Sequence, residues 1–521
     1  MFSALSLSYL SPVVLFLVAG LALGKPGRRP GWLTRCSELA AFLALVLTAG
    51  GLLQVIFAGP GPLAATAGPI ELVLRADLVS ATMALLVGFI GWIVMRYSRT
   101  YLDGEAREGM FHGLMLATLS AVLLFVQAGS VATIIIAAIF VGLTLKRLLL
   151  FYPDRPEAQR AATKFALVWH TGDLLLILAA TLLFVNFGTT ELGALSIAVS
   201  AEGLGLAGTV AVALIVVAAA LKTASFPLHG WLTEVMEAPT PVSALLHAGI
   251  INSGGVLLIA TSGLVQASAG AMAALVLIGG LTALFGAAVM LTQSAIKTAL
   301  AWSTVSQMGF MLLQCGLGLW ALALLHIVAH SLYKAHAFLS SGGAVQEVAS
   351  LRRPGPVAVP DFGAVLRSFA LALVLYAGIA TLFTVLFGVK STQALALGAI
   401  LIFGVAYLVA QGLADRAPVE LTKRTVATSL AAAIAYFSFQ ALADAIWGPI
   451  LPTAPTPGPL EWALIVVAVT SFGLVALAQS LFPLWAHHPS TAGLRVHLAN
   501  GLYLNALLDR AIGGFSRTRP N

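Results

Sequence analysis

The sequence has few charged residues and no long polar stretch, and these deficits exclude most soluble proteins. Only 9% of the 521 residues are Asp, Glu, Lys or Arg, whereas a typical soluble domain has about 25%. The longest polar connections, near residues 346–364 and 487–500, are too short to fold alone. Because 60% of the residues are hydrophobic, the chain is predicted to be a polytopic membrane protein.

Cysteine and nucleotide-binding motifs are also scarce. The two cysteines, Cys36 and Cys315, match no CxxC or metal-ligand spacing. There is no GxGxxG after a predicted strand and no P-loop. We therefore expect no cofactor in this chain, whether redox group, metal or nucleotide. Basic loops beside the membrane account for the net charge of +7, so no nucleic-acid partner is predicted.

The hydrophobic residues form long runs that predict the fold. Spanning a membrane requires about 20 apolar residues per helix, and runs of this length fit helices rather than barrel strands. We expect an all-α protein of about 15 transmembrane helices. They lie near residues 4–24, 34–57, 76–97, 111–128, 131–151, 164–187, 207–226, 240–262, 268–291, 295–314, 318–345, 365–388, 392–413, 425–447 and 460–486. No basic residue precedes the first run, which predicts a retained helix and not a cleaved signal peptide.

Basic residues mark one side of the membrane. They cluster after the first, third, fifth, eleventh, thirteenth and fifteenth runs, within residues 25–35, 96–107, 146–164, 352–367, 416–424 and 495–519. The positive-inside rule makes these loops cytoplasmic. The expected location is therefore a bacterial inner membrane, with the N-terminus outside and the C-terminus in the cytoplasm.

Three lysines interrupt the apolar runs. Lys222, Lys297 and Lys334 lie in stretches that otherwise read as transmembrane helices, where an ionisable group costs roughly 2.5–3.5 kcal/mol on insertion scales. His247 lies in the run that follows Lys222. These residues predict a buried polar path for protons, with sodium as a less favoured cation.

A stripe of ionisable residues occupies the eleventh run. His326, His330 and Lys334 are four residues apart, which places them on one helix face over about 12 Å of its axis. Histidine changes charge near neutral pH, so the stripe fits a proton relay. The alternatives are helix–helix hydrogen bonds without transport, or metal binding by the two histidines, for which no further ligand is evident.

The seventh run is expected to break just after its lysine. Pro227 removes a helix hydrogen bond, and a broken helix beside a charge is a common ion-site device. Asp173, in the sixth run, is the predicted partner of Lys222. The aspartate would keep the lysine charged, and the lysine would release its proton when the pair loosens. The alternatives are a Lys222 that reaches the interface and an Asp173 that faces water at a helix end.

Other charges lie closer to the predicted surface. Glu234 and Glu237 fall on a cytoplasmic connection, where they either funnel protons or are simply solvated. Lys297 lies either on the path or near the cytoplasmic interface. Lys390 ends the twelfth run, which we expect to be broken at glycines 378 and 388 as a counterpart of the seventh, and it is a candidate for proton uptake, release or coupling.

Three motifs resemble those of a known family. The run K-x3-FPLHGWLxxxMEAPTPVSALLHAG begins at Lys222, and IKxxLAWSTVSQMGF and HxxxHxxxKAxxFLxxG follow it. They resemble the proton-translocating membrane subunits of respiratory complex I, multisubunit cation antiporters and related hydrogenase and carbon-uptake complexes, over roughly residues 110–345. The resemblance implies two inverted five-helix repeats whose half-channels are joined by a central axis of lysines and histidines. The axis positions are taken by Lys222, His247, Lys297, His326, His330 and Lys334, and Asp173 fits the family's G-D position.

The implied organisation has four parts and one departure. The parts are residues 1–109 (helices 1–3), 110–264 (first repeat), 265–414 (second repeat) and 415–521 (C-terminal helices and cytoplasmic tail). Where family members read W-E-G-x-G-L on the fifth helix, this chain has Ile139 at the acidic position. The usual Lys–Glu pair is therefore absent, which leaves Asp173 as the acid for Lys222. No long lateral helix is expected after the fifteenth run.

The tail RVHLANGLYLNALLDR resembles the membrane subunits of DAB inorganic-carbon accumulation complexes. That resemblance implies a non-enzymatic proton-conducting subunit that couples cation influx to a large soluble zinc-binding partner, similar to a carbonic anhydrase, on the cytoplasmic face. The basic loops and residues 487–521 would bind the partner or anchor at membrane lipids. The alternatives are a pumping subunit of a complex I or hydrogenase assembly and a sodium/proton antiporter subunit.

Overall fold

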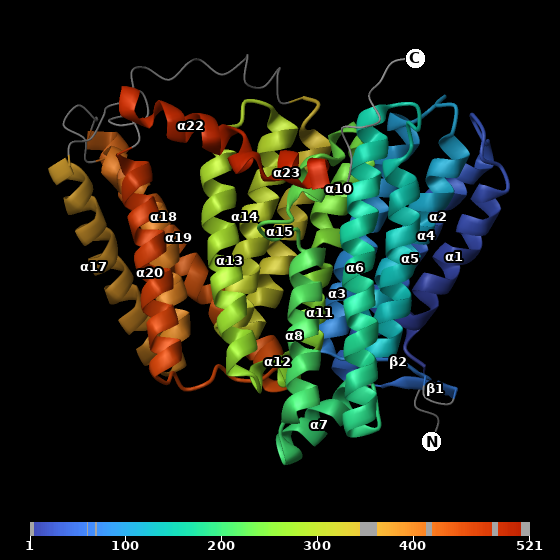
Figure 1. Ribbon diagram of the computed structural model, residues 1–521, viewed down its shortest axis with the longest axis horizontal. Helices are drawn as coiled ribbons and strands as arrows, with labels where there is room; N and C mark the ends of the chain where they lie inside the picture. The colour runs from blue at the N-terminus through green and yellow to red at the C-terminus, as the bar shows by residue number, and fades with distance from the viewer. Residues whose placement is uncertain are drawn as a thin grey trace.

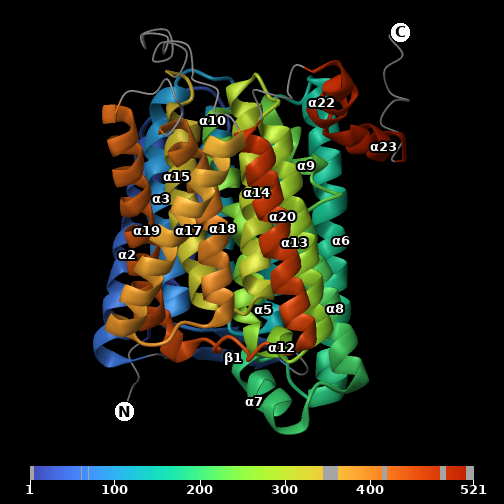
Figure 2. The ribbon, with the colours of Figure 1, turned by 90° about the vertical axis from the view of Figure 1, so that its left-hand side faces the viewer.

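The computed structural model describes residues 5–59, 61–67, 70–343, 362–412, 419–481 and 488–511. These parts form a bundle of long, roughly aligned helices (Figures 1 and 2). Twelve of the described helices are long and apolar enough to cross a membrane, and three further apolar helices are shorter (Leu7–Leu23, Leu192–Glu202 and Thr392–Ala406). The all-α polytopic fold is confirmed, whereas the count of about fifteen spans is not.

The N-terminal half of the bundle holds the sixth helix, which supplies Asp173. Its elements are α1 (Leu10–Leu23), α2 (Trp32–Ala58), α3 (Leu78–Tyr101), α4 (Glu108–Val126), α5 (Val131–Leu149) and α6 (Pro156–Phe187). Helix α6 packs against α5 on one side and α8 (Gly205–Lys222) on the other. Phe57 and Val185 are among the large apolar side chains that stay exposed on these helices, as expected where lipid replaces water as the solvent.

The predicted break after Lys222 is confirmed. Helix α8 ends at this lysine, and the chain resumes as α9 (Gly230–Thr233) and the 3-10 turn η2 (Val235–Glu237). A second interruption was not predicted from the sequence. The next span consists of α10 (Thr240–Ala248), η3 (Ile250–Asn252) and α11 (Ser253–Ala260), and it is interrupted at Gly249, two residues after His247. Both interruptions therefore lie beside a candidate path residue.

Helices α13 (Ala269–Met290), α14 (Ile296–Gly316) and α15 (Trp320–Ser340) form the centre of the bundle. Glycines let α13 and α14 approach closely: a Cβ on Gly309 would lie 2.4 Å from the backbone nitrogen of Ala283, and one on Gly279 would lie 2.5 Å from that of Leu313. Small residues at a helix interface have this effect in membranes, where dispersion contacts drive association.

The C-terminal helices α17 (Phe362–Phe387), α18 (Thr392–Gly412), α19 (Val419–Trp447) and α20 (Pro459–Ser480) lie along one side of α13–α15 (Figure 2). The predicted break in the twelfth run is wrong. Helix α17 continues through Gly378 and ends before Gly388, whose φ of +88° allows the turn that brings Lys390 to the start of α18. One glycine inside a long apolar helix costs only about 1 kcal/mol, too little to break it.

The two ends of the bundle differ. One end carries α7 (Leu192–Glu202), α12 (Ser262–Gln266) and the antiparallel hairpin β1 (Leu63–Ala67)–β2 (Ile70–Leu74), and the other carries α22 (Ala492–Ala499) and α23 (Leu504–Ala511) (Figure 1). We call these the hairpin end and the tail end. The first described residues lie at the hairpin end and the last at the tail end. The predicted domain boundaries and inverted repeats stay predictions.

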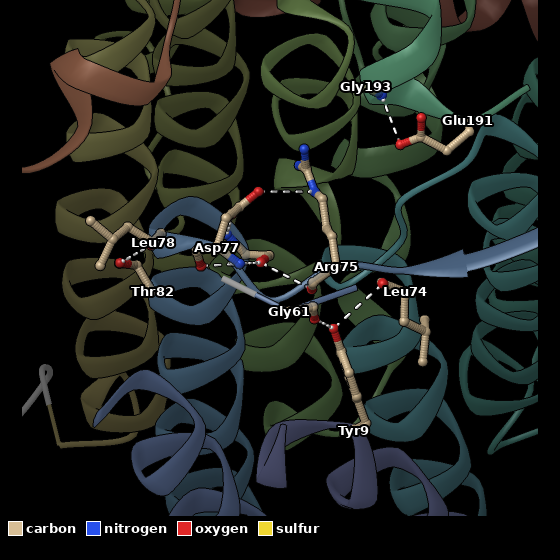
Figure 3. A network of polar contacts seen from close by, with 10 residues as sticks. Tyr9, Gly61, Leu74, Arg75, Asp77, Leu78, Thr82, Glu191 and Gly193 are labelled. Carbon is tan, nitrogen blue, oxygen red and sulfur yellow. Dashed lines mark hydrogen bonds and ion pairs between the residues drawn. The ribbon is translucent and has the colours of Figure 1, made fainter. Parts of the chain in front are cut away.

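Polar contacts secure the hairpin end (Figure 3). The Tyr9 hydroxyl donates a hydrogen bond to the carbonyl of Gly61. Asp77 caps α3 by accepting from the backbone N–H of Ser80 at 2.7 Å, and the Arg75 side chain lies 3.7 Å from the same carboxylate. These contacts hold the start of α1, the hairpin and the start of α3 together.

Candidate functional site

Lys222 and Asp173 form a buried ion pair. The Lys222 Nζ lies 2.6 Å from the Asp173 Oδ1, and 4.0 Å from the centre of the Trp169 ring. Lys222 has no exposed surface and Asp173 is 3% exposed. The predicted pairing is therefore confirmed as a contact, and neither a lysine at the interface nor an aspartate facing water describes these residues.

The sequence of α6 explains why the pair is tight. Gly172 lies directly against the lysine side chain, where a Cβ would come within 3.4 Å of the Lys222 Cε. The Trp169 indole N–H donates to the carbonyl of Ala138 at 2.9 Å, which fixes the ring beneath the ammonium. A cation over an aromatic face gains about 2 kcal/mol or more when desolvated, which offsets part of the cost of burying the charged lysine.

His170 extends this ion pair toward the surface and was not predicted as a path residue. Its Nδ1 lies 2.8 Å from the second carboxylate oxygen of Asp173, and its side chain is 36% exposed. The i, i+3 spacing of His170 and Asp173 was the available signal. Asp173 thus connects a fully buried lysine to a histidine that is partly open.

The missing acid on α5 is not replaced from that helix. Ile139 is partly buried and packs against the hydrophobic core. Within the described residues, Asp173 is the carboxylate in ion-pair contact with Lys222. This geometry agrees with the prediction that Asp173 is the acidic partner of Lys222.

His247 and His330 meet at the centre of the bundle. His247 is completely buried, its Nδ1 lies 3.1 Å from the Thr304 hydroxyl, and its ring stacks on Phe338 with 4.3 Å between centres. The His330 Nε2 donates to the backbone carbonyl of His247 at 3.2 Å. The interruption at Gly249 lies two residues beyond His247, so the break in this span is adjacent to the histidine contact.

The predicted stripe on α15 is present. The His326 and His330 rings lie 6.0 Å apart, and the His326 Nδ1 lies 2.9 Å from the Gln314 side-chain oxygen. Lys334 is fully buried and donates to the Leu300 carbonyl at 2.9 Å. Within the described residues Lys334 has no ion pair, in contrast to Lys222. No three His, Cys, Asp or Glu side chains in this part of the chain converge as metal ligands.

A small cavity separates the two clusters. Its volume is about 20 Å³, and its lining includes Trp169, Asn252 and Ser331 among apolar side chains. The Asn252 amide donates to the Ser331 hydroxyl at 3.0 Å, while its side-chain oxygen has no partner within the described residues. This volume fits about one water molecule. No direct hydrogen bond joins Lys222 to His247 among the described contacts.

Lys297 lies away from the central cluster. It is half-buried in the first turn of α14 and donates to the Thr240 hydroxyl at 3.1 Å. Lys390 is 8% exposed and lies 3.9 Å from Asp444 of α19. Neither residue joins the two buried clusters directly.

Both candidate glutamates at the tail end have cationic partners. Glu237 pairs with Arg155 at 2.7 Å on the surface. Glu234 lies 2.6 Å from the Nζ of Lys164, which is fully buried and also lies 2.6 Å from Asp509 of α23. Burial raises the pKa of Glu234, although Lys164 opposes this shift. These acids are therefore paired groups and not simply solvated charges.

The Lys164 cluster was missed from the sequence. Lys164 belongs to a basic run after the fifth predicted helix, and that context indicated a solvated loop. Helix α23 contributes Asp509 to this cluster, and it also contacts the loop after α8, where Asn505 donates to the Thr233 hydroxyl at 3.2 Å. A Cβ on Gly230 would come within 1.7 Å of the Asn505 side-chain oxygen, so this glycine leaves the space that the tail occupies.

Known proteins resemble this chain in sequence and in fold. Residues 128–354 match the family described as NADH:quinone oxidoreductase/Mrp antiporter, TM, and residues 64–112 match NADH-Ubiquinone oxidoreductase (complex I), chain 5 N-terminus. The probable inorganic carbon transporter subunit DabB2 of Halothiobacillus neapolitanus is 38% identical over 492 residues, which cover 93% of this chain and 88% of that protein.

Other relatives match over shorter lengths. The probable inorganic carbon transporter subunit DabB of Hydrogenovibrio crunogenus is 43% identical over 51% of this chain and 52% of its own length. The NADH-quinone oxidoreductase subunit L of Mycobacterium tuberculosis is 35% identical over 56% of this chain and 48% of its own. A chain of the Mrp complex from Dietzia sp. shares the fold, with a TM-score of 0.62 and 24% identity over 98% of this chain and 59% of that one.

Proposed function

The chain belongs to the DabB-like family of antiporter-type membrane subunits, and from this premise we propose that it conducts protons as the membrane subunit of an inorganic-carbon uptake complex. Its relative DabB2, of which it covers 88%, is named as a probable inorganic carbon transporter subunit. The chain is proposed to act as a transporter subunit and not as an enzyme in its own right.

The buried Lys222–Asp173 pair carries the proposal. Removing two charges from water costs several kcal/mol per ion, and a well-packed apolar pair is often as stable. An ion pair at membrane depth is therefore a candidate for a transport role. The pair also has what a relay needs: a fully buried donor, a single acid, and a half-exposed histidine on the other carboxylate oxygen.

The second cluster supports the same function. His326, His330 and Lys334 lie on one face of α15, and His330 is joined to His247. A proton that leaves Lys222 would cross the gap at Trp169 and Asn252 by way of a bound water, because the cavity there has room for about one. In this scheme Lys297, Glu234 and Glu237 serve proton uptake or release at the tail end.

The tail end is proposed to face the cytoplasm and to bind the partner. Lys146, Arg147 and Arg155 lie there, which fits the positive-inside rule. Three of the basic residues on which this orientation was predicted, Arg352, Arg353 and Arg416, lie outside the described residues. The partner would be a large soluble zinc-binding protein similar to a carbonic anhydrase. The chain would lie in a bacterial inner membrane, and protons moving inward through it would energise one-way hydration of CO2 by the partner.

A second candidate function is proton pumping within a complex I or hydrogenase assembly. The 35% identity to subunit L of an NADH-quinone oxidoreductase favours it, but Ile139 in place of the family's acid on α5 counts against it. A sodium/proton antiporter subunit is a further alternative, and sodium-dependent growth at alkaline pH would favour it.

Growth of a carbonic-anhydrase-deficient bacterium in ordinary air tests the proposal. The chain is expressed with the large soluble protein proposed as its partner, and each is also expressed alone. Rescue that requires both proteins is expected for carbon uptake. If both proteins are present and associated in the membrane but growth still requires added CO2, the carbon-uptake function is wrong. That result would favour proton pumping within a complex I or hydrogenase assembly.

A further inference from the structure

A polar hollow at the hairpin end shares no lining residue with the candidate proton path. It has a volume of about 340 Å³. It lies between the start of α3, helix α7, the α11–α12 junction and the 3-10 turn η4 (Gly448–Ile450) after α19. Arg75 and Asp77 are the charged side chains of its lining, and Ser196 and Ser262 contribute hydroxyls. We call it the hairpin-end hollow.

Arg75 reaches this hollow from the loop between β2 and α3. Its backbone N–H donates to the Gln127 carbonyl at 2.8 Å, which fixes the base of the side chain. That side chain is 23% exposed, so water competes only partly for it. Its buried Nε has no hydrogen-bond partner in the part of the chain that the structure describes. Because a guanidinium is a rigid fork of five N–H donors that stays charged, Arg75 is suited to bind an anion with adjacent oxygens.

Asp77 places an acceptor beside this fork (Figure 3). Its Oδ1 accepts from the Ser80 backbone N–H at 2.7 Å as the cap of α3, whereas its Oδ2 lies 3.7 Å from the Arg75 Nε. That distance is too long for a hydrogen bond. The ion pair is therefore loose, and Oδ2 keeps the capacity to accept a hydrogen bond from a ligand.

Two serine hydroxyls extend the polar wall of the hollow. Ser262 is buried and Ser196 is half-buried. A Cβ on Gly263 would lie 2.5 Å from the Ser196 hydroxyl oxygen, so this glycine leaves the room that the hydroxyl occupies. A hydroxyl both donates and accepts, and these two can therefore complete the hydrogen bonds of an anion in the hollow.

A donor fork next to a carboxylate oxygen favours an anion that carries its own proton. Two oxygens of bicarbonate can accept from the guanidinium, while its hydroxyl donates to the Asp77 Oδ2. Nitrate has the same charge and the same planar shape but no proton, so one of its oxygens would face the carboxylate with nothing to donate. A site that hydrogen-bonds a ligand hydroxyl rejects the analogue that lacks it, because a polar group is left unpaired.

We propose that the hairpin-end hollow binds bicarbonate, with Arg75 on two of its oxygens and the Asp77 Oδ2 on its hydroxyl. Inorganic phosphate shares this chemistry, since it also carries a proton near neutral pH. The choice of bicarbonate rests on the proposed function, in which the hairpin end faces the solution that supplies inorganic carbon. Binding itself requires no transport, and it is therefore measurable on the chain alone.

Thermal unfolding of the purified full chain in lipid nanodiscs tests the site. Sodium bicarbonate, nitrate or phosphate is titrated at a pH where bicarbonate predominates, with sodium chloride holding the ionic strength constant. A ligand that binds only the folded chain raises the melting temperature as its concentration increases. We expect the apparent dissociation constant to be at least tenfold lower for bicarbonate than for nitrate. This comparison uses the wild-type chain and depends on no variant.

Two variants then assign the response to residues. Arg75→Gln should abolish the response to bicarbonate, whereas the matched control Arg99→Gln should keep it, because Arg99 pairs with Glu38 at the other end of α3. Asp77→Asn keeps a good helix cap and puts an N–H donor where Oδ2 accepted. It should weaken bicarbonate binding at least tenfold and leave nitrate binding as tight as before or tighter.

The remaining outcomes would contradict the proposal. The site is refuted if bicarbonate gives no response, if nitrate binds as tightly as bicarbonate, or if Arg75→Gln responds like wild type. Phosphate that binds more tightly than bicarbonate would overturn the assignment to inorganic carbon. Failure of the growth test with bicarbonate binding intact would refute the proposed function and leave this site standing, so the two failures are distinguishable.

Discussion

Replacing Asp173 with Asn removes the charge that faces Lys222 while nearly preserving shape. The two side chains meet at 2.6 Å in a site from which water is excluded. At an effective dielectric constant near 20, charges at that distance attract by about 6 kcal/mol. The asparagine leaves either an unpaired buried ammonium or a neutral amine.

The size of the effect on stability or on proton flux depends on whether Lys222 stays charged or becomes neutral. Breaking a buried pair by removing one partner costs about 3–5 kcal/mol. If the lysine stays charged, the protein loses that much stability. If it becomes neutral instead, the proton is held less well by the same free energy, and 3 kcal/mol corresponds to about two decades in a protonation equilibrium. We therefore expect proton flux to fall by about 100-fold or more in Asp173→Asn.

The assay is proton flux into proteoliposomes, with thermal unfolding in detergent measured beside it. Asp173→Glu, which keeps the charge, should retain more flux than Asp173→Asn. His170→Gln removes the other partner of the same carboxylate, but that side chain is 36% exposed and solvent can replace it, so flux should fall by less than tenfold. If Asp173→Asn has both wild-type flux and wild-type stability, the pair is not part of the path and the reasoning fails.

Three further predictions concern other groups. Lys334→Met removes the charge on α15 and leaves its carbonyl partner unpaired, a cost of about 1–3 kcal/mol; the protein should still insert, with proton flux at least tenfold lower, and normal flux would contradict the relay. Asp509→Asn weakens the contact with buried Lys164, so trypsin should cleave within α23 about tenfold faster if the contact is worth about 1.4 kcal/mol; an unchanged rate would show that other contacts hold the tail. Partial burial raises the pKa of Glu71, but hydrogen bonds from residues 189–191 outweigh this and hold it below 4.5. Its stabilisation is therefore full above that pH and lost as pH falls through the lower folded value; Glu71→Gln should lower the melting temperature near neutral pH and flatten its acid dependence, and equal melting curves would refute this.

The sequence predicted those features that a single segment encodes. Lysine in an apolar run followed by Pro227 was enough to place the break of α8, and the i, i+4 spacing of His326, His330 and Lys334 was enough to place the stripe. Asp173 was identified as the partner of Lys222 because burial leaves a lysine few alternatives.

Features that depend on distant segments were not predictable. Lys164 is in a basic run, yet it is fully buried and pairs with Asp509, more than three hundred residues later. The break expected at Gly378 did not occur, since glycine weakens a helix without removing a hydrogen bond, as proline does. The interruption at Gly249 accompanies the contact between His247 and His330, which no local pattern reveals.

Uptake of labelled inorganic carbon, by cells that express the chain with the large soluble protein proposed as its partner, tests whether the buried lysine couples protons to carbon uptake. Wild type and Lys222→Ala are compared, each with and without a protonophore, after both are shown to insert and to bind the partner. We expect uptake by wild type that the protonophore abolishes, and no uptake by Lys222→Ala. Full, protonophore-sensitive uptake by Lys222→Ala would contradict it, because protons would then energise transport without the buried lysine.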